Sequence, residues 1–320
     1  MIEADRLSKF YGSKAAVLDL SFRIESGTVV GFLGLNGAGK TTTLRLLSGD
    51  LESSVGTVRI GGVDLSANPR EVKRKIGFLP DQPPLYPEMT VHGYLRYAGG
   101  IRGLSGSELE ARVTEVEKLV RVADVANDLV ASLSHGYRQR LGIGQAIVHR
   151  PELVILDEPI SGLDPVQIAD MRELIRALAG QHTVLLSSHI LTEISQTCDR
   201  ILVMGKGRII ADGTEEELRK QLVRGGVVDV TVRGDATTVR GRLAGLDGVK
   251  SVEVLADAKA AEPGTVRLRV QAAGDVREAI ARKLVEGGFG LLALGNSEHE
   301  LEDVFVELTR DRSASTQART

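Results

Sequence analysis

A glycine-rich segment, GLNGAGKT at Gly34–Thr41, constrains this chain more than any other feature of its sequence. It has the spacing G-x-x-x-x-G-K-[ST], in which the backbone turns so that its N–H groups point inward at phosphate oxygens. The segment follows an apolar run at residues 29–33 and precedes a helical pattern that carries Leu44 and Leu47. The N-terminus of that helix adds a partial positive charge. This order of strand, loop and helix predicts a phosphate-binding loop.

The side chains of this loop predict contacts to a nucleotide. We expect Lys40 to reach the β- and γ-phosphates and the Thr41 hydroxyl to bind Mg²⁺. The glycines allow the turn because they adopt backbone angles that other residues rarely adopt. The residues predicted to bind the nucleotide here are Gly34, Asn36, Gly37, Gly39, Lys40, Thr41 and Thr42.

Asp157 closes a second apolar run, at residues 153–157, and Glu158 follows it directly. An Asp at the carboxyl end of a buried parallel strand lies at the sheet edge where α/β folds bind ligands, so Asp157 is placed to hold Mg²⁺ beside the phosphates. Glu158 is a candidate to orient or deprotonate an attacking water. On spacing alone, an ordinary exposed loop acid explains Glu158 equally well.

The apolar patterns predict an α/β core with a helical insert. Residues 153–157 and 183–188 are short runs with β-branched residues, typical of strands buried in a parallel sheet, and helical patterns lie between them. Residues 15–24 and 56–65 predict further strands near the N-terminus. Residues 85–150 predict a mostly helical insert.

The start of one insert helix carries a recognisable pattern. Ser107 and Glu110 have the Ser-x-x-Glu spacing of a capping box, and Val113, Val116 and Val120 follow at helical spacing. The sequence therefore predicts a helix that begins at Ser107 and buries its valines.

The pattern changes near residue 222 and predicts a second domain. Residues 223–310 read as β-α-β-β-α-β plus a final helix, which suggests a small α+β domain of the ferredoxin-like type. In one strand, Val266, Leu268 and Val270 face one way and the intervening arginines the other. The final helix would bury Leu301, Val304, Phe305 and Leu308, and the polar residues 311–320 are expected to be disordered. We therefore expect a first domain at 1–222.

Composition excludes several classes of protein. The chain has 320 residues and a net charge of −3, so no global basic field predicts nucleic-acid binding. Cys198 is the only cysteine, which makes internal disulfides impossible. The N-terminus lacks the apolar region of a secretory signal, and no stretch approaches the roughly 18 apolar residues of a spanning helix. If the protein serves a membrane, another polypeptide must cross it.

Five further segments, taken in order, make residues 3–215 resemble the nucleotide-binding subunits of ABC transporters. As an ordered set they are highly specific. They are Tyr11, LPDQ at Leu79–Gln82, LSHGYRQR at Leu133–Arg140, SGLD at Ser161–Asp164, and His189. The resemblance implies a P-loop NTPase core of the ABC type, with an N-terminal antiparallel β subdomain beside the helical insert. It also implies that the chain binds and hydrolyses ATP with Mg²⁺.

The resemblance implies a role at each matching position. Tyr11 would stack on adenine. Glu158 and His189 would act on the γ-phosphate and its attacking water, together with Lys40. Asp164 belongs to a loop that contacts a second nucleotide-binding subunit. Taken alone, Tyr11 is more typical of a packing residue and His189 of an ordinary surface or core histidine.

Two segments depart from the family pattern. The common signature is Leu-Ser-Gly-Gly-Gln, and here His135 and Tyr137 occupy its third and fifth positions. Ser134 and Gly136 remain, and they would bind the γ-phosphate through a hydroxyl and a backbone N–H. In the glutamine loop, either Asp81 or Gln82 would contact Mg²⁺ or water, because the usual glutamine position is occupied by Asp81.

The resemblance also implies partners. The phosphate loop and the signature each occur once, so a complete ATP site requires a head-to-tail dimer of nucleotide-binding subunits, which we expect to be a homodimer. A separate integral membrane permease would carry the substrate, which places this subunit on the cytoplasmic face of the cell membrane. LEDVFVELT at Leu301–Thr309 is similar to the end of the accessory domain on bacterial exporter subunits, including antibiotic-efflux and gliding-type members, and favours export.

Three alternatives compete with this interpretation. A soluble, non-transport ABC ATPase would act on a macromolecular complex, but its translation-type members carry two nucleotide domains and its DNA-repair members carry zinc fingers or long coiled coils. A P-loop GTPase or kinase leaves the signature unexplained, and the sequence has no Asn-Lys-x-Asp motif. A catalytically inactive regulatory subunit is disfavoured by the presence of Glu158 and His189.

Overall fold

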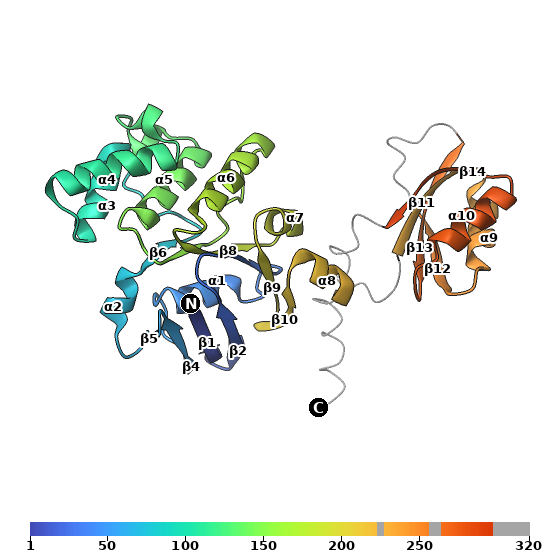
Figure 1. Cartoon of the computed structure of the whole chain (residues 1–320), viewed down its shortest axis with the longest axis horizontal. Coiled ribbons are helices and arrows are strands. Elements are labelled where there is room, and N and C mark those ends of the chain that lie inside the picture. The colour runs from blue at the N-terminus through green and yellow to red at the C-terminus, as the bar shows by residue number, and fades with distance from the viewer. Residues whose placement is uncertain (223–226, 256–263, 297–320) are drawn as a thin grey trace. The chain divides into compact units, whose positions relative to one another are not determined.

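The computed structural model describes residues 1–222, 227–255 and 264–296 (Figure 1). The chain divides into two compact units, Met1–Glu215 and Glu216–Thr320. This division falls before the boundary that the sequence suggests after residue 222, within the helix α8 (Glu215–Leu222). None of the described helices is long and apolar enough to cross a membrane.

A six-stranded sheet forms the centre of the first unit. Its strand order is β10-β9-β3-β8-β7-β6, in which all neighbours run parallel except β10 and β9. Every residue of β3, β7 and β8 is buried, as the apolar runs predict. The strands are β3 (Val29–Leu33), β6 (Ile76–Leu79), β7 (Leu153–Leu156), β8 (Thr183–Ser188), β9 (Arg200–Gly205) and β10 (Arg208–Gly213).

An antiparallel sheet packs against this central layer. Its order is β2-β1-β4-β5, from β1 (Ile2–Tyr11), β2 (Lys14–Ile24), β4 (Val55–Ile60) and β5 (Val63–Asp64). Phe22 of β2 meets Phe32 of β3 edge to face, with ring centroids 5.7 Å apart. The two sheets share one hydrophobic core, which also takes in α1 (Lys40–Leu47) and Val72 of α2 (Pro69–Arg74). The predicted N-terminal antiparallel β subdomain is therefore confirmed.

The helical insert lies between β6 and β7 (Figure 1). It contains α3 (Val91–Ile101), α4 (Gly106–Leu119), two short 3₁₀ turns (Ala123–Val125 and Val130–Ser132) and α5 (His135–Ile147). After β7 come α6 (Pro165–Leu178) and, beyond β8, the short helix α7 (Leu191–Ser195). The chain thus leaves the sheet at its edge strand β6 and returns from the insert into the neighbouring strand β7.

The predicted capping box in this insert is wrong. Helix α4 begins at Gly106 with Ser105 at the N-cap, so Ser107 lies inside the helix and no side chain caps it. The Glu110 carboxylate instead pairs with Arg96 of α3, at 2.7 Å, because the neighbouring helix offers it a charged partner. The buried valines of α4 follow the predicted spacing.

The second unit contains a four-stranded antiparallel sheet in the order β12-β13-β11-β14. Its described elements follow one another as β-α-β-β-α-β, as predicted. They are β11 (Val227–Arg233), α9 (Ala236–Ala244), β12 (Val249–Val254), β13 (Thr265–Ala272), α10 (Arg277–Glu286) and β14 (Gly290–Asn296).

Two helices and one face of this sheet form the core of the second unit. Val266, Leu268 and Val270 are buried there with apolar residues of α9 and α10. The predicted final helix, with its stripe of Leu301, Val304, Phe305 and Leu308, lies outside the described residues, as do residues 311–320.

Candidate functional site

The phosphate loop connects β3 to α1, at the carboxyl edge of the parallel sheet. Gly37 and Gly39 have φ angles of 83° and 104°, in the left-handed region that side chains disfavour. A Cβ atom on Gly39 would also lie 2.7 Å from the carbonyl oxygen of Ala16. Glycine is therefore required at position 39, where the loop becomes the N-cap of α1.

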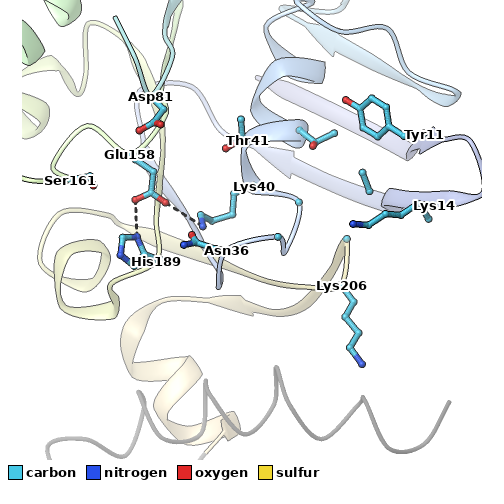
Figure 2. A pocket seen from close by; sticks show the side chains of 16 residues that line it. Tyr11, Lys14, Asn36, Lys40, Thr41, Asp81, Glu158, Ser161, His189 and Lys206 are labelled. Carbon is cyan, nitrogen blue, oxygen red and sulfur yellow. Dashed lines mark hydrogen bonds and ion pairs between the residues drawn. The ribbon is translucent and has the colours of Figure 1, made fainter. Parts of the chain in front are cut away.

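A pocket of about 730 Å³ opens at this loop. Figure 2 shows the side chains of the loop, the β1–β2 hairpin, and the ends of β6, β7 and β8 around it. Its lining comprises Tyr11, Lys14, Ala15, Ala16, Asn36, Gly37, Gly39, Lys40, Thr41, Thr42, Asp81, Glu158, Ser161, His189, Lys206 and Gly207. The fold thus gathers predicted residues from widely separated parts of the chain.

Lys40 is held at the base of this pocket. Its ammonium group donates to the carbonyl oxygen of Gly34 at 2.7 Å and pairs with the Glu158 carboxylate at 3.2 Å (Figure 2). Only 6% of the Lys40 side chain is exposed. A buried, paired cation beside inward-facing backbone N–H groups is suited to an anionic phosphate group.

Asp157 lies under the loop and supplies a second polar cluster. Its Oδ1 atom accepts from the hydroxyl of Ser187 at 2.6 Å and from that of Thr41 at 3.3 Å. Burial raises the pKa of Asp157 above its usual range, and the two hydroxyl groups oppose that shift. A hydroxyl and a carboxylate side by side fit Mg²⁺, which takes few protein oxygens and completes its shell with water and phosphate oxygens.

Glu158 turns away from the sheet into the pocket. Its φ of 49° is left-handed, and its backbone N–H donates to the Ser187 hydroxyl at 2.8 Å. Ser187 therefore accepts from the Glu158 backbone and donates to the Asp157 carboxylate, which ties both acidic residues to β8. The Glu158 Oε2 atom lies 3.0 Å from Nδ1 of His189. Carboxylate, imidazole and ammonium consequently meet in one place.

His189 is positioned by its sequence neighbours. The Ser188 hydroxyl donates to the buried carboxylate of Glu193 at 2.5 Å and accepts from the backbone N–H of Ile190 at 3.0 Å. Both contacts fix the turn between β8 and α7. The His189 ring, which is 41% exposed, is left at the pocket wall with Glu158.

Tyr11 lies at the outer end of the pocket and is half exposed. The ammonium group of Lys9 lies 5.7 Å from the centre of its ring. An exposed aromatic ring at a pocket wall is suited to stack on a planar base.

Several predicted residues lie outside this pocket. Ser134 is the N-cap of α5 and accepts from the backbone N–H of Tyr137, while a Cβ atom on Gly136 would meet Gln167 at 2.8 Å. Asp164 is the N-cap of α6 and accepts from the backbone N–H groups of Val166 and Gln167 at 3.0 and 2.9 Å. Gly34 does not line the pocket, but its carbonyl oxygen accepts a hydrogen bond from Lys40. Gln82 borders a separate groove beside the pocket. Of the described residues, only Asp81 borders both the pocket and this groove.

Comparison with known proteins gives a consistent result. Residues 17–161 match the family model described as ABC transporter. The linearmycin resistance ATP-binding protein LnrL of Bacillus subtilis is 32% identical over 97% of this chain and 98% of its own length. This chain belongs to the ABC transporter ATP-binding proteins. The bacitracin transport ATP-binding protein BcrA of Bacillus licheniformis is also 32% identical, over 96% of this chain and 97% of its own length.

A solved structure supports the fold of this ABC transporter ATP-binding protein. The structure of an ATP-binding subunit of an ABC transporter is 33% identical, with a TM-score of 0.63, and covers 69% of this chain and 92% of that one. The family and the fold make this chain a P-loop ATPase. They also bear out the transporter assignment over the soluble alternative.

Some residues at the site of this ABC transporter ATP-binding protein belong to no recognised sequence motif. Lys14, Lys206 and Gly207 reach it from strand turns that carry no motif. The Lys206–Gly207 turn is held against the loop, since the Gly207 N–H donates to the carbonyl of Ala38 at 2.9 Å. Ser187 does not belong to a motif either, and Ser161 is indicated only because it is the first residue of the SGLD segment. Proximity in the fold, rather than a sequence pattern, reveals them.

Proposed function

We propose that the pocket binds Mg·ATP and hydrolyses its γ-phosphate, and that Lys40, Glu158 and His189 carry out the reaction. The observation that carries this proposal is that the Glu158 carboxylate contacts both the Lys40 ammonium and the His189 imidazole beside the phosphate loop. Lys40 stabilises negative charge on the β- and γ-phosphates. Glu158 orients and polarises the attacking water, and His189 donates to the γ-phosphate as charge develops on it.

The Thr41 hydroxyl and Asp157 carboxylate would hold Mg²⁺, with Asp81 as a further oxygen ligand at the pocket wall. The bound ion supplies charge neutralisation on the phosphate oxygens. The backbone around Gly37 and Gly39, with Asn36 and Thr42, would hold the phosphates, and Tyr11 would stack on adenine.

The ATP site becomes complete in a head-to-tail homodimer. Ser134 and Gly136 lie at the N-terminus of α5 and border none of the pocket formed by their own phosphate loop. A second subunit, turned about a two-fold axis, would present them to the γ-phosphate, where backbone N–H groups and a hydroxyl suit an anion. Asp164 lies in the loop that would meet this second subunit. Loss of the γ-phosphate contacts on hydrolysis would release the dimer.

A groove beside the pocket is suited to a membrane permease subunit. It has a volume of about 490 Å³ and is lined by Asp81, Gln82, Pro83, Leu85, Pro87, Val130, Ala131, His135, Arg138 and Gln139. Asp81 borders both groove and pocket, so a shift at the nucleotide would reach a segment bound in the groove. Gln139 is 2% exposed, and its buried Oε1 atom has no hydrogen-bond partner among the described residues.

We further propose that this subunit lies on the inner face of the cell membrane and energises export of an antimicrobial compound. Three relatives that match nearly the whole chain, second unit included, are named for linearmycin resistance, bacitracin transport and daunorubicin resistance. Deleting the gene should sensitise cells to such compounds. The wild-type gene should restore resistance, and a Glu158→Gln gene should not.

Size-exclusion chromatography of purified Glu158→Gln protein tests the dimer. With Mg·ATP it should elute as a dimer, and with EDTA as a monomer. The double variant Lys40→Ala, Glu158→Gln is the matched control and should remain monomeric in both conditions. A monomer with Mg·ATP, in protein that still binds the nucleotide, would contradict the shared-site geometry.

A further inference from the structure

His135 occupies the third position of the signature and contacts a loop of its own subunit. Its Nε2 atom lies 3.0 Å from the carbonyl oxygen of Ser161. A carbonyl oxygen only accepts, so the ring donates through Nε2–H. His135 is also the first residue of α5, directly after Ser134 at the N-cap. The histidine thus connects the start of the signature helix to the loop that follows Glu158.

The Ser161 end of this contact belongs to the pocket. Ser161 lines the pocket, and its backbone N–H donates to the carbonyl oxygen of Glu158 at 3.2 Å. Gly162 follows with a φ of 74°, and a Cβ atom there would lie 3.4 Å from the His135 ring. The left-handed turn therefore lets the ring approach Ser161 closely. Two hydrogen bonds join Glu158 to Ser161 and Ser161 to His135.

These two ends serve different ATP sites in the proposed dimer. Glu158 and Ser161 border the ATP held by their own phosphate loop, whereas Ser134 would contact the ATP held by the second subunit. A signature glycine at position 135 would have no side chain with which to donate to Ser161. We propose that His135 is a positioning residue that couples the two ATP sites, by holding the signature helix in register with the loop after Glu158. This inference rests on the proposed homodimer.

The contact predicts cooperative hydrolysis. When ATP displaces Glu158 from Lys40 in one site, the loop carrying Ser161 shifts, and His135 passes that shift to Ser134 in the other site. Without the hydrogen bond, each site would respond to its own nucleotide alone. The imidazole donates through Nε2–H in both its neutral Nε2–H form and its protonated form, so the coupling does not require a particular charge on His135.

A matched pair of variants tests whether the hydrogen bond, rather than the bulk of the side chain, is what matters. Gln at position 135 has an amide N–H donor that can reach Ser161, and Glu has nearly the same shape but only acceptors when ionised. His135→Ala removes the group altogether. For each purified protein, ATP hydrolysis is measured against ATP concentration at saturating Mg²⁺, with kcat, KM and the Hill coefficient as readouts. Binding of a fluorescent ATP analogue to the isolated subunit, and Tm, are measured in parallel.

We expect wild type and His135→Gln to hydrolyse ATP with a Hill coefficient above 1. His135→Glu and His135→Ala should lower kcat roughly three- to tenfold, the effect of losing one ordinary hydrogen bond, and bring the Hill coefficient to about 1. Analogue binding to the isolated subunit should stay unchanged, because His135 lies outside its own pocket, and Tm should fall by no more than about 4 °C, the effect of one lost hydrogen bond. The three readouts separate coupling from a merely structural effect.

Equal behaviour of the Gln and Glu variants would overturn the proposal, as would a wild-type Hill coefficient of 1. Loss of analogue binding in the Glu and Ala variants would also overturn it, by showing that His135 supports its own site. If the proposed ATPase function were wrong, the result would be different, because wild-type protein would then hydrolyse no ATP at all.

Discussion

Lys40 and Glu158 neutralise each other inside the pocket. Their Nζ and Oε1 atoms lie 3.2 Å apart, and 6% and 14% of the two side chains are exposed. The cation that would bind the phosphates and the acid that would polarise water are therefore paired to each other. In the proposed mechanism, an incoming triphosphate would draw Lys40 away from Glu158, and this would release the carboxylate toward the water.

Glu158→Gln should bind ATP more tightly than wild type and hydrolyse it at least about 100-fold more slowly. The amide removes a negative charge beside the phosphates and frees Lys40, and it also removes the group that polarises water. Calorimetric titration of ATP gives Kd, and phosphate release gives turnover. Lys40→Ala is the control, and it should weaken binding. Weaker binding by Glu158→Gln would contradict the proposed competition between carboxylate and phosphate for Lys40.

Gly39→Ala should abolish ATP binding and lower Tm, because a Cβ atom at position 39 would lie 2.7 Å from the Ala16 carbonyl in a left-handed backbone. Gly12 is a matched control, since its φ of 59° is also left-handed but its Cβ position is open. Gly12→Ala should cost only about 1 kcal/mol of backbone strain and leave binding intact. Thermal unfolding and nucleotide titration compare the two. Equal losses would show that backbone angle, rather than close approach, is what requires glycine.

Tyr11→Ala should raise the KM for ATP by roughly 5- to 100-fold, the usual effect of removing one aromatic ring that stacks on a base. Tyr11→Phe keeps the ring and should remain close to wild type. The kcat should change little in either variant, because the ring lies far along the pocket wall from the reacting phosphate. A kcat loss in Tyr11→Ala without a change in KM would contradict the assignment of Tyr11 to the base.

Protonation of His149 should destabilise the first unit in acid. Burial, reinforced by Arg102 and Arg112, lowers the pKa of His149 to about 4 from its ordinary value of 6.5. Its Nε2 atom lies 3.1 Å from the carbonyl oxygen of Ile76, and its buried Nδ1 atom has no hydrogen-bond partner among the described residues. Protons therefore bind the unfolded chain more readily, so stability is present above pH 6.5 and falls as the pH drops toward 4.

His149→Gln keeps an N–H donor for Ile76 but cannot gain this proton. We expect Tm to fall less in the variant than in wild type between pH 7 and pH 4.5, with the difference growing below pH 6.5. Differential scanning fluorimetry at several pH values measures it. A difference in Tm that stays constant with pH would show that another group controls the acid sensitivity.

The sequence predicted the strands around the pocket because their signals are local. The apolar, β-branched composition of residues 153–157 and 183–188 predicts buried strands, and the glycine spacing of Gly34–Thr41 predicts the phosphate loop. The predicted cap of α4 is wrong, because a glutamate at the capping-box spacing can form an ion pair with a residue of α3 instead of capping its own helix. Glu110 does so with Arg96, a contact no local pattern encodes.

The parts of the site that could not be predicted from the sequence depend on how the fold brings distant segments together. Ser187 lies within a buried strand, yet it bonds to both Asp157 and the Glu158 backbone. Lys206 reaches the pocket only because β9 and β10 return beside the phosphate loop. The His135 contact to Ser161 joins two motifs that are adjacent only in the folded chain.

The most direct test of the transporter assignment is the recovery of a membrane partner. Tagged Glu158→Gln protein is purified in mild detergent from its native membranes with Mg·ATP, and the co-purifying proteins are identified by mass spectrometry. The Lys40→Ala, Glu158→Gln protein serves as the control. We predict stoichiometric recovery of a multi-spanning membrane protein with the single variant. Recovery of only ribosomal or DNA-associated proteins, or of no partner, would contradict the proposal that this ATPase energises a membrane permease.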